Sequence, residues 1–230
     1  YFRTIGMVDG QLGFAGNIGT EYFPGVTDTI PLYVTRDGGE HWAPVTGIGG
    51  PEVKGLCAID VLRTHYVNAG QAVERVLVHA AGRVGGPAFL MRSLDAGATW
   101  KSIDMNAHIA MITDVKFFDE MNGLVLGADD ANVEHAHAVI ASTRDGGVTW
   151  HRVYTSARPY ELMWKVSFPT RQVGYATVQS YDPDTTVTRR VVAKTVDGGR
   201  TWQEIPLVDA FSVREFGVGF VDAQTGWVGA

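Results

Sequence analysis

The densest group of side chains that could hold a metal lies in residues 129–137. It contains Asp129, Asp130, Glu134, His135 and His137. Imidazole and carboxylate groups are zinc ligands, and a His-x-His pair on one strand would place both rings on the same face. A further ligand would have to come from another part of the fold, for which His108 is the candidate. We favour the alternative, a solvated loop, and expect neither a metal nor a cofactor.

Two further groups could contact a ligand. Tyr181, Asp182 and Asp184 could bind calcium or perform acid–base chemistry, although Asp-x-Asp in a proline-containing loop is also ordinary turn chemistry. Tyr22 and Phe23 could form an aromatic platform for a sugar or a protein partner, or could pack down on the domain. These residues complete the predicted ligand face, and no pattern assigns a catalytic residue.

A repeated octet must build the frame that positions these side chains. It occurs at residues 35–42, 93–100, 143–150 and 195–202, and the third copy reads Thr-Arg-Asp-Gly-Gly-Val-Thr-Trp. Asp-Gly-Gly followed by Thr-Trp predicts a tight β-hairpin whose carboxylate accepts hydrogen bonds from N–H groups one to three residues further on. The aspartates are therefore interpreted as structural, because each of them closes its own turn.

Differences between the copies indicate what each position needs. The second glycine never varies, so it is predicted to adopt a left-handed conformation. Ala96 replaces the first glycine, so that position is predicted not to require a positive φ. The tryptophan is expected to anchor the outer strand. The predicted structural residues are Asp37, Gly39, Trp42, Asp95, Gly97, Trp100, Asp145, Gly147, Trp150, Asp197, Gly199 and Trp202.

The spacing of the octets predicts the architecture. Successive octet tryptophans are 58, 50 and 52 residues apart, and a second glycine-aromatic motif, such as Gly174-Tyr175, recurs with the same phase. A period near fifty with several short strands predicts an all-β propeller of four-stranded blades. We place the blades at about 1–48, 49–106, 107–156 and 157–208, with a partial blade at 209–230. The half blade predicts a piece of a larger ring of roughly seven blades, with closure by two chains as the alternative.

These motifs resemble a known family. The octet resembles the Asp-box of the bacterial neuraminidase repeat. Its pairing with the second motif, as in Val221-x-x-x-x-Gly226-Trp227, is most similar to the propeller family of the photosystem II stability and assembly factor. Sialidases, xyloglucanases and sortilin-type receptors share the Asp-box on related propellers. The resemblance implies a binding or assembly role, and a periplasmic or extracellular setting.

Composition limits the function. The 230 residues carry a formal net charge of −6 without a basic run, which argues against nucleic-acid binding. No apolar segment is long enough to span a bilayer. The single cysteine, Cys57, lies in an apolar strand pattern and is expected to be buried.

Chain direction in such blades sorts the loops into two faces. The octets are turns on one face, which also carries a long loop predicted at 63–74. Most other long loops lie on the opposite face, where a site near the axis is expected. We predict a non-catalytic scaffold that binds a protein partner or a glycan. The alternatives are a glycoside hydrolase of sialidase or xyloglucanase type, a carbohydrate-binding propeller, and a purely structural repeat domain. Sialidase chemistry needs an arginine cluster, and the inner strands supply only Lys116, Lys165 and Arg214, apart from a weak Arg3-Thr4-Ile5 match.

Overall fold

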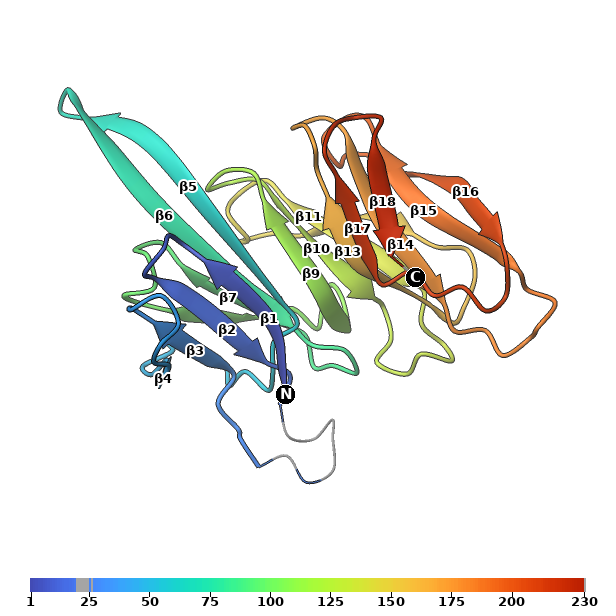
Figure 1. The fold of residues 1–230 in the computed structure, drawn as a ribbon, viewed down its shortest axis with the longest axis horizontal. Coiled ribbons are helices and arrows are strands. Elements are labelled where there is room, and N and C mark those ends of the chain that lie inside the picture. Colours follow the sequence, from blue (N-terminus) through green and yellow to red (C-terminus); the bar gives the residue numbers. More distant parts are fainter. Residues whose placement is uncertain (20–24, 26, 230) are drawn as a thin grey trace.

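The chain forms four antiparallel four-stranded sheets followed by a two-stranded sheet (Figure 1). The computed structural model describes residues 1–19, 25 and 27–229, and this part of the chain contains strands but no helix. Consequently, no described element is a helix that could cross a membrane. Each sheet is a meander in which sequence neighbours pair, and the first strands of successive sheets contact one another. This is the predicted β-propeller, with the first strand of each blade innermost.

The strands of the blades follow the chain order. Blade 1 contains β1 (Phe2–Met7), β2 (Gly13–Asn17), β3 (Leu32–Thr35) and β4 (Ala43–Pro44). Blade 2 contains β5 (Ala58–Asn68), β6 (Gln71–Gly82), β7 (Phe89–Ser93) and β8 (Lys101–Asp104). Blade 3 contains β9 (Met111–Phe117), β10 (Gly123–Ala128), β11 (Ala138–Thr143) and β12 (His151–Thr155). Blade 4 contains β13 (Glu161–Ser167), β14 (Gly174–Ser180), β15 (Arg189–Thr195) and β16 (Gln203–Asp209), and the last sheet contains β17 (Gly217–Phe220) and β18 (Gly226–Gly229).

The connection between the first two strands of blade 2 differs from the sequence-based expectation. We predicted a long loop at 63–74, but β5 and β6 stay paired from Ala58↔Ala81 to Asn68↔Gln71 and form a hairpin that projects from the blades (Figure 1). Its two-residue turn has positive φ at Ala69 (49°) and Gly70 (80°), the turn geometry that matches the twist of paired strands. The polar residues of this segment hid the strand pattern, because a projecting hairpin has no buried face.

The octets form the same hydrogen-bonded turn four times. In the third copy, the Thr143 hydroxyl donates to Asp145 Oδ1 (2.8 Å) and accepts from the Gly147 N–H (2.8 Å). Asp145 Oδ1 also accepts from the N–H groups of Val148 (3.1 Å) and Thr149 (2.9 Å). The other copies repeat the aspartate contact with the N–H four residues on, at 2.9–3.0 Å. The donor three residues on lies within the predicted range, whereas the donor four residues on lies one residue beyond it, because both glycine positions are needed to reverse the chain.

Backbone angles confirm one prediction about the octets and correct another. Gly39, Gly97, Gly147 and Gly199 all have positive φ, between 80° and 98°, as predicted. The preceding position is also left-handed in every copy, and Ala96 adopts it with φ at 56°. The prediction that this position needs no positive φ was wrong, because one alanine can occupy this region at a modest energetic cost.

Hydrogen bonds hold the octet aspartates in their ionised form. The hydroxyl and N–H of Thr149 lower the pKa of Asp145 to about 2. In the first copy the His41 ring replaces the threonine hydroxyl, with Nδ1 2.7 Å from Asp37 Oδ2. These carboxylates are therefore saturated acceptors within their own turns, as the structural interpretation requires.

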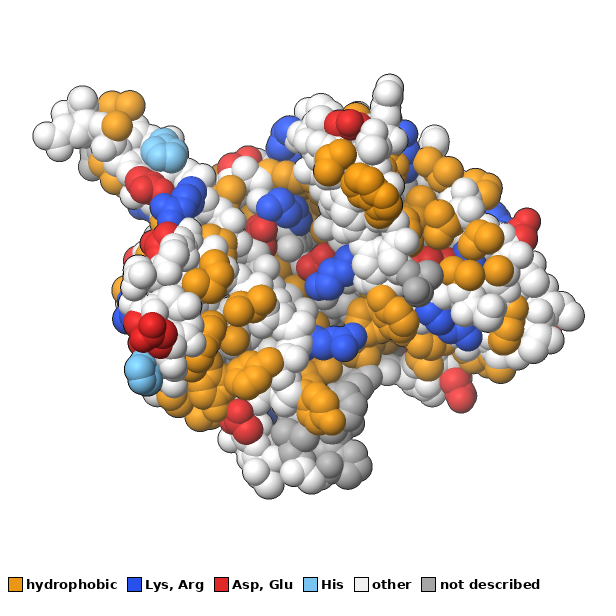
Figure 2. Space-filling view, viewed as in Figure 1, with side chains coloured by type: hydrophobic (Ala, Val, Ile, Leu, Met, Phe, Trp, Pro, Cys, Tyr) orange, Lys and Arg blue, Asp and Glu red, His pale blue; other side chains and the backbone are white. Residues whose placement is uncertain are grey.

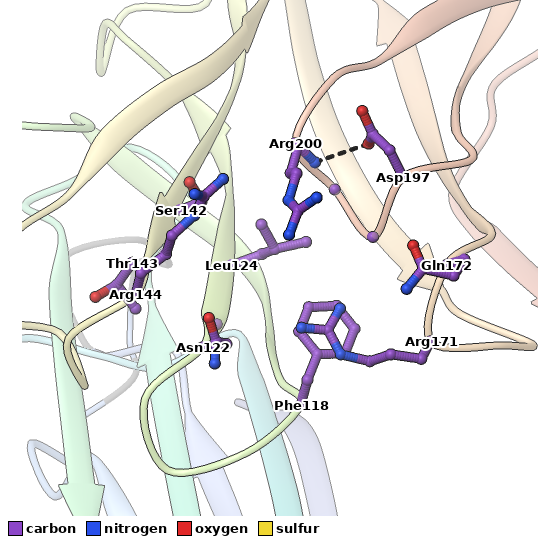
Figure 3. A pocket seen from close by; sticks show the side chains of 13 residues that line it. Phe118, Asn122, Leu124, Ser142, Thr143, Arg144, Arg171, Gln172, Asp197 and Arg200 are labelled. Atoms are coloured by element: carbon purple, nitrogen blue, oxygen red, sulfur yellow. Dashed lines mark hydrogen bonds between the residues drawn. The ribbon is translucent and has the colours of Figure 1, made fainter.

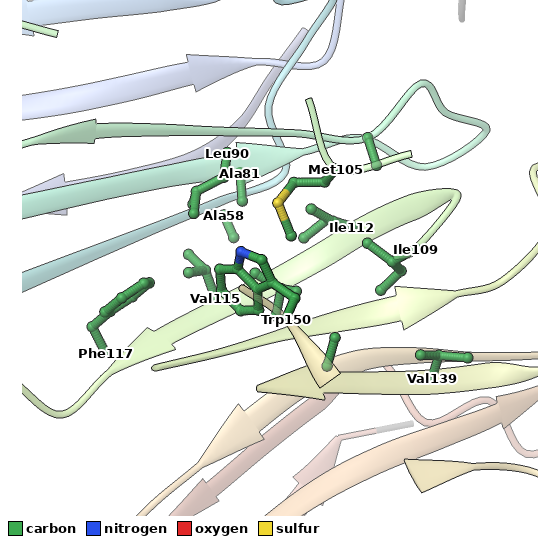
Figure 4. Packing of buried hydrophobic residues seen from close by; sticks show 13 residues of the cluster. Ala58, Ala81, Leu90, Met105, Ile109, Ile112, Val115, Phe117, Val139 and Trp150 are labelled. Carbon is green, nitrogen blue, oxygen red and sulfur yellow. The ribbon is translucent and has the colours of Figure 1, made fainter. Parts of the chain in front are cut away.

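Most of the hydrophobic core lies between blades. One cluster joins Ala58, Ala81 and Leu90 of blade 2 to Ile112, Phe117 and Trp150 of blade 3 (Figure 4). The clusters between blades 1 and 2 and between blades 3 and 4 contain Trp100 and Trp202 in the same role. In each case, the octet tryptophan packs toward the preceding blade while its indole N–H donates to the second octet glycine's carbonyl. Each octet thus links a turn to the blade interface.

Trp42 is the exception among the octet tryptophans. It makes the same indole contact with Gly39 (3.1 Å), but it lines an open hollow with Phe2 and Ile5 on the outer face of blade 1. Phe2 and Ile5 are both more than 60% exposed. Figure 2 shows hydrophobic side chains gathered over this blade.

We predict that Trp150→Ala lowers the free energy of unfolding by about 3–5 kcal/mol, because it removes a buried side chain and leaves a cavity between blades. The matched control is Trp42→Ala, which removes the same indole hydrogen bond on the open face and should cost about 1 kcal/mol. Urea unfolding of both variants measures the difference. Equal losses would contradict the role assigned to the blade interface.

A buried histidine makes stability depend on pH. His79 is 1% exposed and stacks on Phe117 at 3.6 Å, and burial, reinforced by Arg92 and Lys116, lowers its pKa to about 3. Its protonation is therefore favoured in the unfolded chain, so stability is present above about pH 6.5 and is lost as pH falls toward 3.

We predict that His79→Leu removes up to about 1.4 kcal/mol per pH unit from this dependence between pH 6.5 and 4.5. Burial raises the pKa of Glu215 to about 7, which acts in the opposite sense over this range. The His79 contribution is therefore read from the difference between variant and parent in urea titrations at several pH values. Exposed His65→Gln is the control, and parallel curves for His79→Leu and the parent would refute the assignment.

Candidate functional site

A cavity lies where the loops of three blades meet on the face opposite the octets. It has a volume of 370 Å³ and lies among the β6–β7, β10–β11 and β14–β15 loops and the inner strand β13. Its lining is Val84, Gly85, Met111, Ala131, Asn132, Val133, Leu162, Trp164 and Tyr181. The position, on the loop face beside the inner strands, is where the sequence predicts a binding site.

Trp164 and Tyr181 are the aromatic centre of this cavity. The Trp164 indole N–H donates to the Tyr181 hydroxyl at 3.0 Å, which fixes the relative orientation of the two rings. Trp164 is 7% exposed and belongs to a cluster with Met111 and Leu162. The pair thus presents ring surface held in one geometry, the kind of anchor that protein and ligand interfaces favour.

A second cavity of 260 Å³ shares Trp164 and lies among the inner strands. It is lined by Phe2, Arg3, Cys57, Thr113, Trp164, Lys165 and Phe216. The Arg3 guanidinium lies 5.1 Å from the Trp164 ring centre, and Phe216 meets the same ring edge-on at 5.5 Å. Figure 2 shows Lys and Arg side chains around the hollow between blade 1 and the last sheets. The two cavities together form one aromatic site with a cationic flank.

Ion pairs between inner strands hold this region in place. Asp60 on β5 accepts from Lys116 Nζ (2.7 Å) and from the Phe117 N–H (2.8 Å) on β9. One blade further on, Asp114 accepts from Lys165 Nζ (3.3 Å) and from the Val166 N–H (2.9 Å) on β13. Burial raises the pKa of Asp114, and Lys165 opposes that shift. The pairs therefore link the inner strands of blades 2, 3 and 4, and they hold Lys165, which follows Trp164 in the sequence, in place.

The arrangement is suited to binding. No aspartate or glutamate is among the described residues that line the two cavities. Burial raises the pKa of the Cys57 thiol, which keeps it protonated and a poor nucleophile. Apolar walls, one aromatic pair and a cationic edge are features that hold a ligand in a defined orientation.

The structure places the predicted ligand-face residues in different surroundings. Tyr22 and Phe23 lie outside the described residues. Tyr181 lines the cavity. Asp182 and Asp184 accept N–H bonds from residues two positions on, at 2.9 Å each, as turn formers do. His108 is half-buried in the loop before β9, where its carbonyl accepts from Arg152 Nε at 3.0 Å.

The histidine group does not bring three ligand atoms together among the described residues. Glu134 and His135 are exposed, and both histidines lie in the loop before β11, as the favoured interpretation of a solvated loop predicts, rather than on one strand. Asp129 instead closes the loop by accepting from the His137 N–H at 2.8 Å. Among the described residues, the one group of three potential ligand side chains within 4.8 Å is Asp37, Glu40 and His41, on the surface of the first octet.

Sequence reasoning missed Trp164, although a signal was present. Four of the six tryptophans close octets, so Trp164 and Trp227 are the two that the repeat does not explain. Trp164 also lies on an inner strand next to Lys165, at the part of a blade nearest the axis. A tryptophan outside the repeat pattern on an inner strand therefore could have marked the site.

We predict that Asp114→Ala lowers the free energy of unfolding by about 1–3 kcal/mol, because it leaves the Val166 N–H and Lys165 without their acceptor. Lys165→Met and the double variant complete a mutant cycle, in which a coupling energy near zero would contradict the pairing. Asp209→Ala, at an exposed position on β16, is the control and should change stability by less than about 0.5 kcal/mol.

Comparison with known proteins places this geometry in context. No family model and no curated protein matches the sequence. A solved structure of YCF48 bound to a D1 peptide superposes with a TM-score of 0.56 at 15% identity, covering 95% of this chain and 56% of that chain. A GH74 enzyme from Niastella koreensis superposes with a TM-score of 0.63 at 14% identity, covering 96% of this chain and 33% of that one.

A GH74 xyloglucanase from Xanthomonas campestris gives a TM-score of 0.52 at 17% identity, covering 87% of this chain and 28% of that chain. The present chain therefore spans about half the length of the YCF48 structure and a third or less of these two GH74 structures. The total blade number of roughly seven stays a prediction. At these identities the likeness concerns architecture, and it confirms the predicted resemblance at that level: the chain shares the β-propeller fold of the photosystem II assembly factor and of the GH74 enzymes.

Proposed function

We propose that this protein is a non-catalytic scaffold that binds an extended segment of a protein partner in the loop-face cavity of Trp164 and Tyr181. The observation that carries the proposal is the hydrogen-bonded aromatic pair at the base of an apolar cavity, flanked by Arg3 and Lys165. An apolar side chain of the partner would enter the cavity, and an acidic group next to it would meet Arg3. No ion pair joins Arg3 to a described carboxylate.

The frame around the cavity supports this role. The cavity walls come from three blades, and these blades are held together by inter-blade clusters and by the Asp60 and Asp114 ion pairs. A rigid ring that carries variable loops can fix several contact residues at little entropic cost on binding. The YCF48 structure, which contains a bound D1 peptide, supports peptide binding as a use of this fold. The family resemblance also favours an exported setting, which we include in the proposal.

A glycan-directed role is the second candidate, and the GH74 likeness is what favours it. Aromatic rings could stack on sugar faces as readily as on a peptide. Hydrolysis, however, requires a pair of carboxyl groups roughly 5–9.5 Å apart, flanking the scissile bond. The absence of aspartate and glutamate from the described lining of both cavities favours the peptide.

We predict that panning a peptide display library on this protein enriches apolar peptides with an acidic flank. Val133→Arg, which fills the cavity with a charged side chain, should weaken a selected peptide at least tenfold in fluorescence anisotropy. The matched control is Val148→Arg, at an 80% exposed position on the octet face, and it should leave affinity unchanged.

Xyloglucan oligosaccharides provide the competing arm of the same assay. Release of reducing ends, or saturable oligosaccharide binding that Val133→Arg abolishes, would replace the peptide proposal with the glycan one. Equal peptide binding by the parent and Val133→Arg would overturn the proposed site.

A further inference from the structure

A third cavity, on the octet face between blades 3 and 4, is lined by several positively charged side chains. It has a volume of 190 Å³ and opens between the β9–β10 turn, the β13–β14 turn and the third and fourth octets. Three arginines line it, namely Arg144, Arg171 and Arg200. Figure 3 shows Arg200 reaching from its turn toward Leu124, with Arg171 lying across Phe118 and Arg144 on the facing wall. We call this cavity the arginine pocket.

One acid, Asp197, is among the residues that line the arginine pocket together with the three arginines. No ion pair joins any of them to a carboxylate of the described residues. Arg171 is held in place by the Phe118 ring, whose centre is 3.9 Å from its guanidinium carbon. An aromatic face orients a guanidinium without neutralising its charge, so the donors remain available to a ligand.

The neighbouring blade interface shows how the same position is otherwise arranged. Phe117 and Phe168 each stand six residues before the glycine that opens the second strand, so Glu120 of blade 3 corresponds to Arg171 of blade 4. Glu120 binds Arg75 through both carboxylate oxygens, at 2.7 and 2.9 Å. Likewise, Val148 of the third octet corresponds to Arg200 of the fourth. Between blades 2 and 3, Glu120 thus pairs with the Arg75 guanidinium. Between blades 3 and 4, no ion pair joins the pocket arginines to a described carboxylate, so their charge is available to a ligand.

The carboxylates near the arginine pocket are already used. Asp197 accepts from the Thr195 hydroxyl (2.8 Å), the Arg200 N–H (3.0 Å), and both the N–H and hydroxyl of Thr201. Asp119 accepts from the Met121 and Asn122 N–H groups and from the Asn122 side chain. These bonds come from neutral donors within the turns. Three arginines and one aspartate therefore give the lining a formal net charge of +2 (3 − 1).

From this geometry we propose that the arginine pocket binds a tetrahedral oxoanion, a phosphate or a sulfate group. Planar guanidinium groups match the spacing of phosphate and sulfate oxygens and donate two hydrogen bonds at once. The Ser142 hydroxyl and the Gln172 amide are neutral donors in the same lining. The small volume suits a single oxoanion group better than a peptide chain. The site is independent of the loop-face function proposed above.

The test is isothermal titration of the whole chain with inorganic phosphate and with inorganic sulfate, at constant ionic strength in chloride. Saturable binding with one site is expected. Arg171→Glu gives blade 4 the acid that blade 3 carries at the corresponding position, Glu120, and should abolish binding. Arg200→Gln should weaken binding at least tenfold. Arg36→Gln, at the octet position equivalent to Arg144 but in blade 1, is the matched control and should bind as the parent does. Unchanged unfolding midpoints in chloride confirm that the variants are folded.

Phenyl phosphate distinguishes a phosphate ester from the free ion. Tighter binding than inorganic phosphate identifies an esterified ligand, and weaker binding identifies the free ion as the natural occupant. Val133→Arg should not affect either titration, so loss of the peptide site and loss of the oxoanion site can be told apart. No saturable heat in the parent, or equal affinity in the parent and Arg171→Glu, would overturn the proposal.

Discussion

The structure depends on the aspartate carboxylate that closes the turn in each octet. Asp145 gathers two N–H groups and two hydroxyls around itself, and the Thr143 hydroxyl relays the contact to the Gly147 N–H. Charge-assisted hydrogen bonds of this kind fix a backbone conformation that would otherwise be costly, because two successive residues lie in the left-handed region. In the second, third and fourth octets, the turn also orients its tryptophan toward the preceding blade. The same hydrogen-bonded turn thus forms the corner of four sheets and, in three of them, positions the tryptophan of the contact between sheets.

Rigidity of the ring follows from how the contacts are distributed. Apolar clusters join neighbouring blades on their broad faces, while Asp60 and Asp114 join the inner strands near the axis. Blades 2, 3 and 4 are thus joined both by apolar clusters and at their inner strands, whereas the apolar cluster alone of these contacts joins blade 1 to blade 2. The two faces of the ring carry different cavities. One carries the aromatic cavity with Trp164, and the other carries the arginine pocket between two octets.

The two cavities differ in chemistry because they are built from different parts of the repeat. The loop face is formed by connections of unequal length and sequence, so the residues that line its cavity are not part of the repeated octet. The octet face is nearly the same in every blade, and single substitutions on it stand out. Arg171 in place of the acid at Glu120, and Arg200 in place of Val148, convert a satisfied interface into a cationic one.

The sequence alone was sufficient for the propeller fold, the left-handed glycines and the turns that the aspartates close. These features are local and repeated, so comparing the four octets shows which positions the turn requires. It also identified the face on which a cavity lies, because chain direction in a meander decides which loops share a face. Tyr181, which the sequence places on that face, lines the cavity.

Only the tertiary structure decided which side chains meet. Trp164 and Tyr181 are 17 residues apart, and the Arg3–Trp164 contact spans most of the chain. Such contacts depend on the angle between blades, and the spacing of motifs in the sequence does not predict that angle. The same holds for the β5–β6 hairpin, because it projects from the blades and lacks the buried face whose apolar alternation marks a strand. Local hydrogen bonding can be recognised from residue order, whereas convergence at an axis depends on packing between segments far apart in the chain.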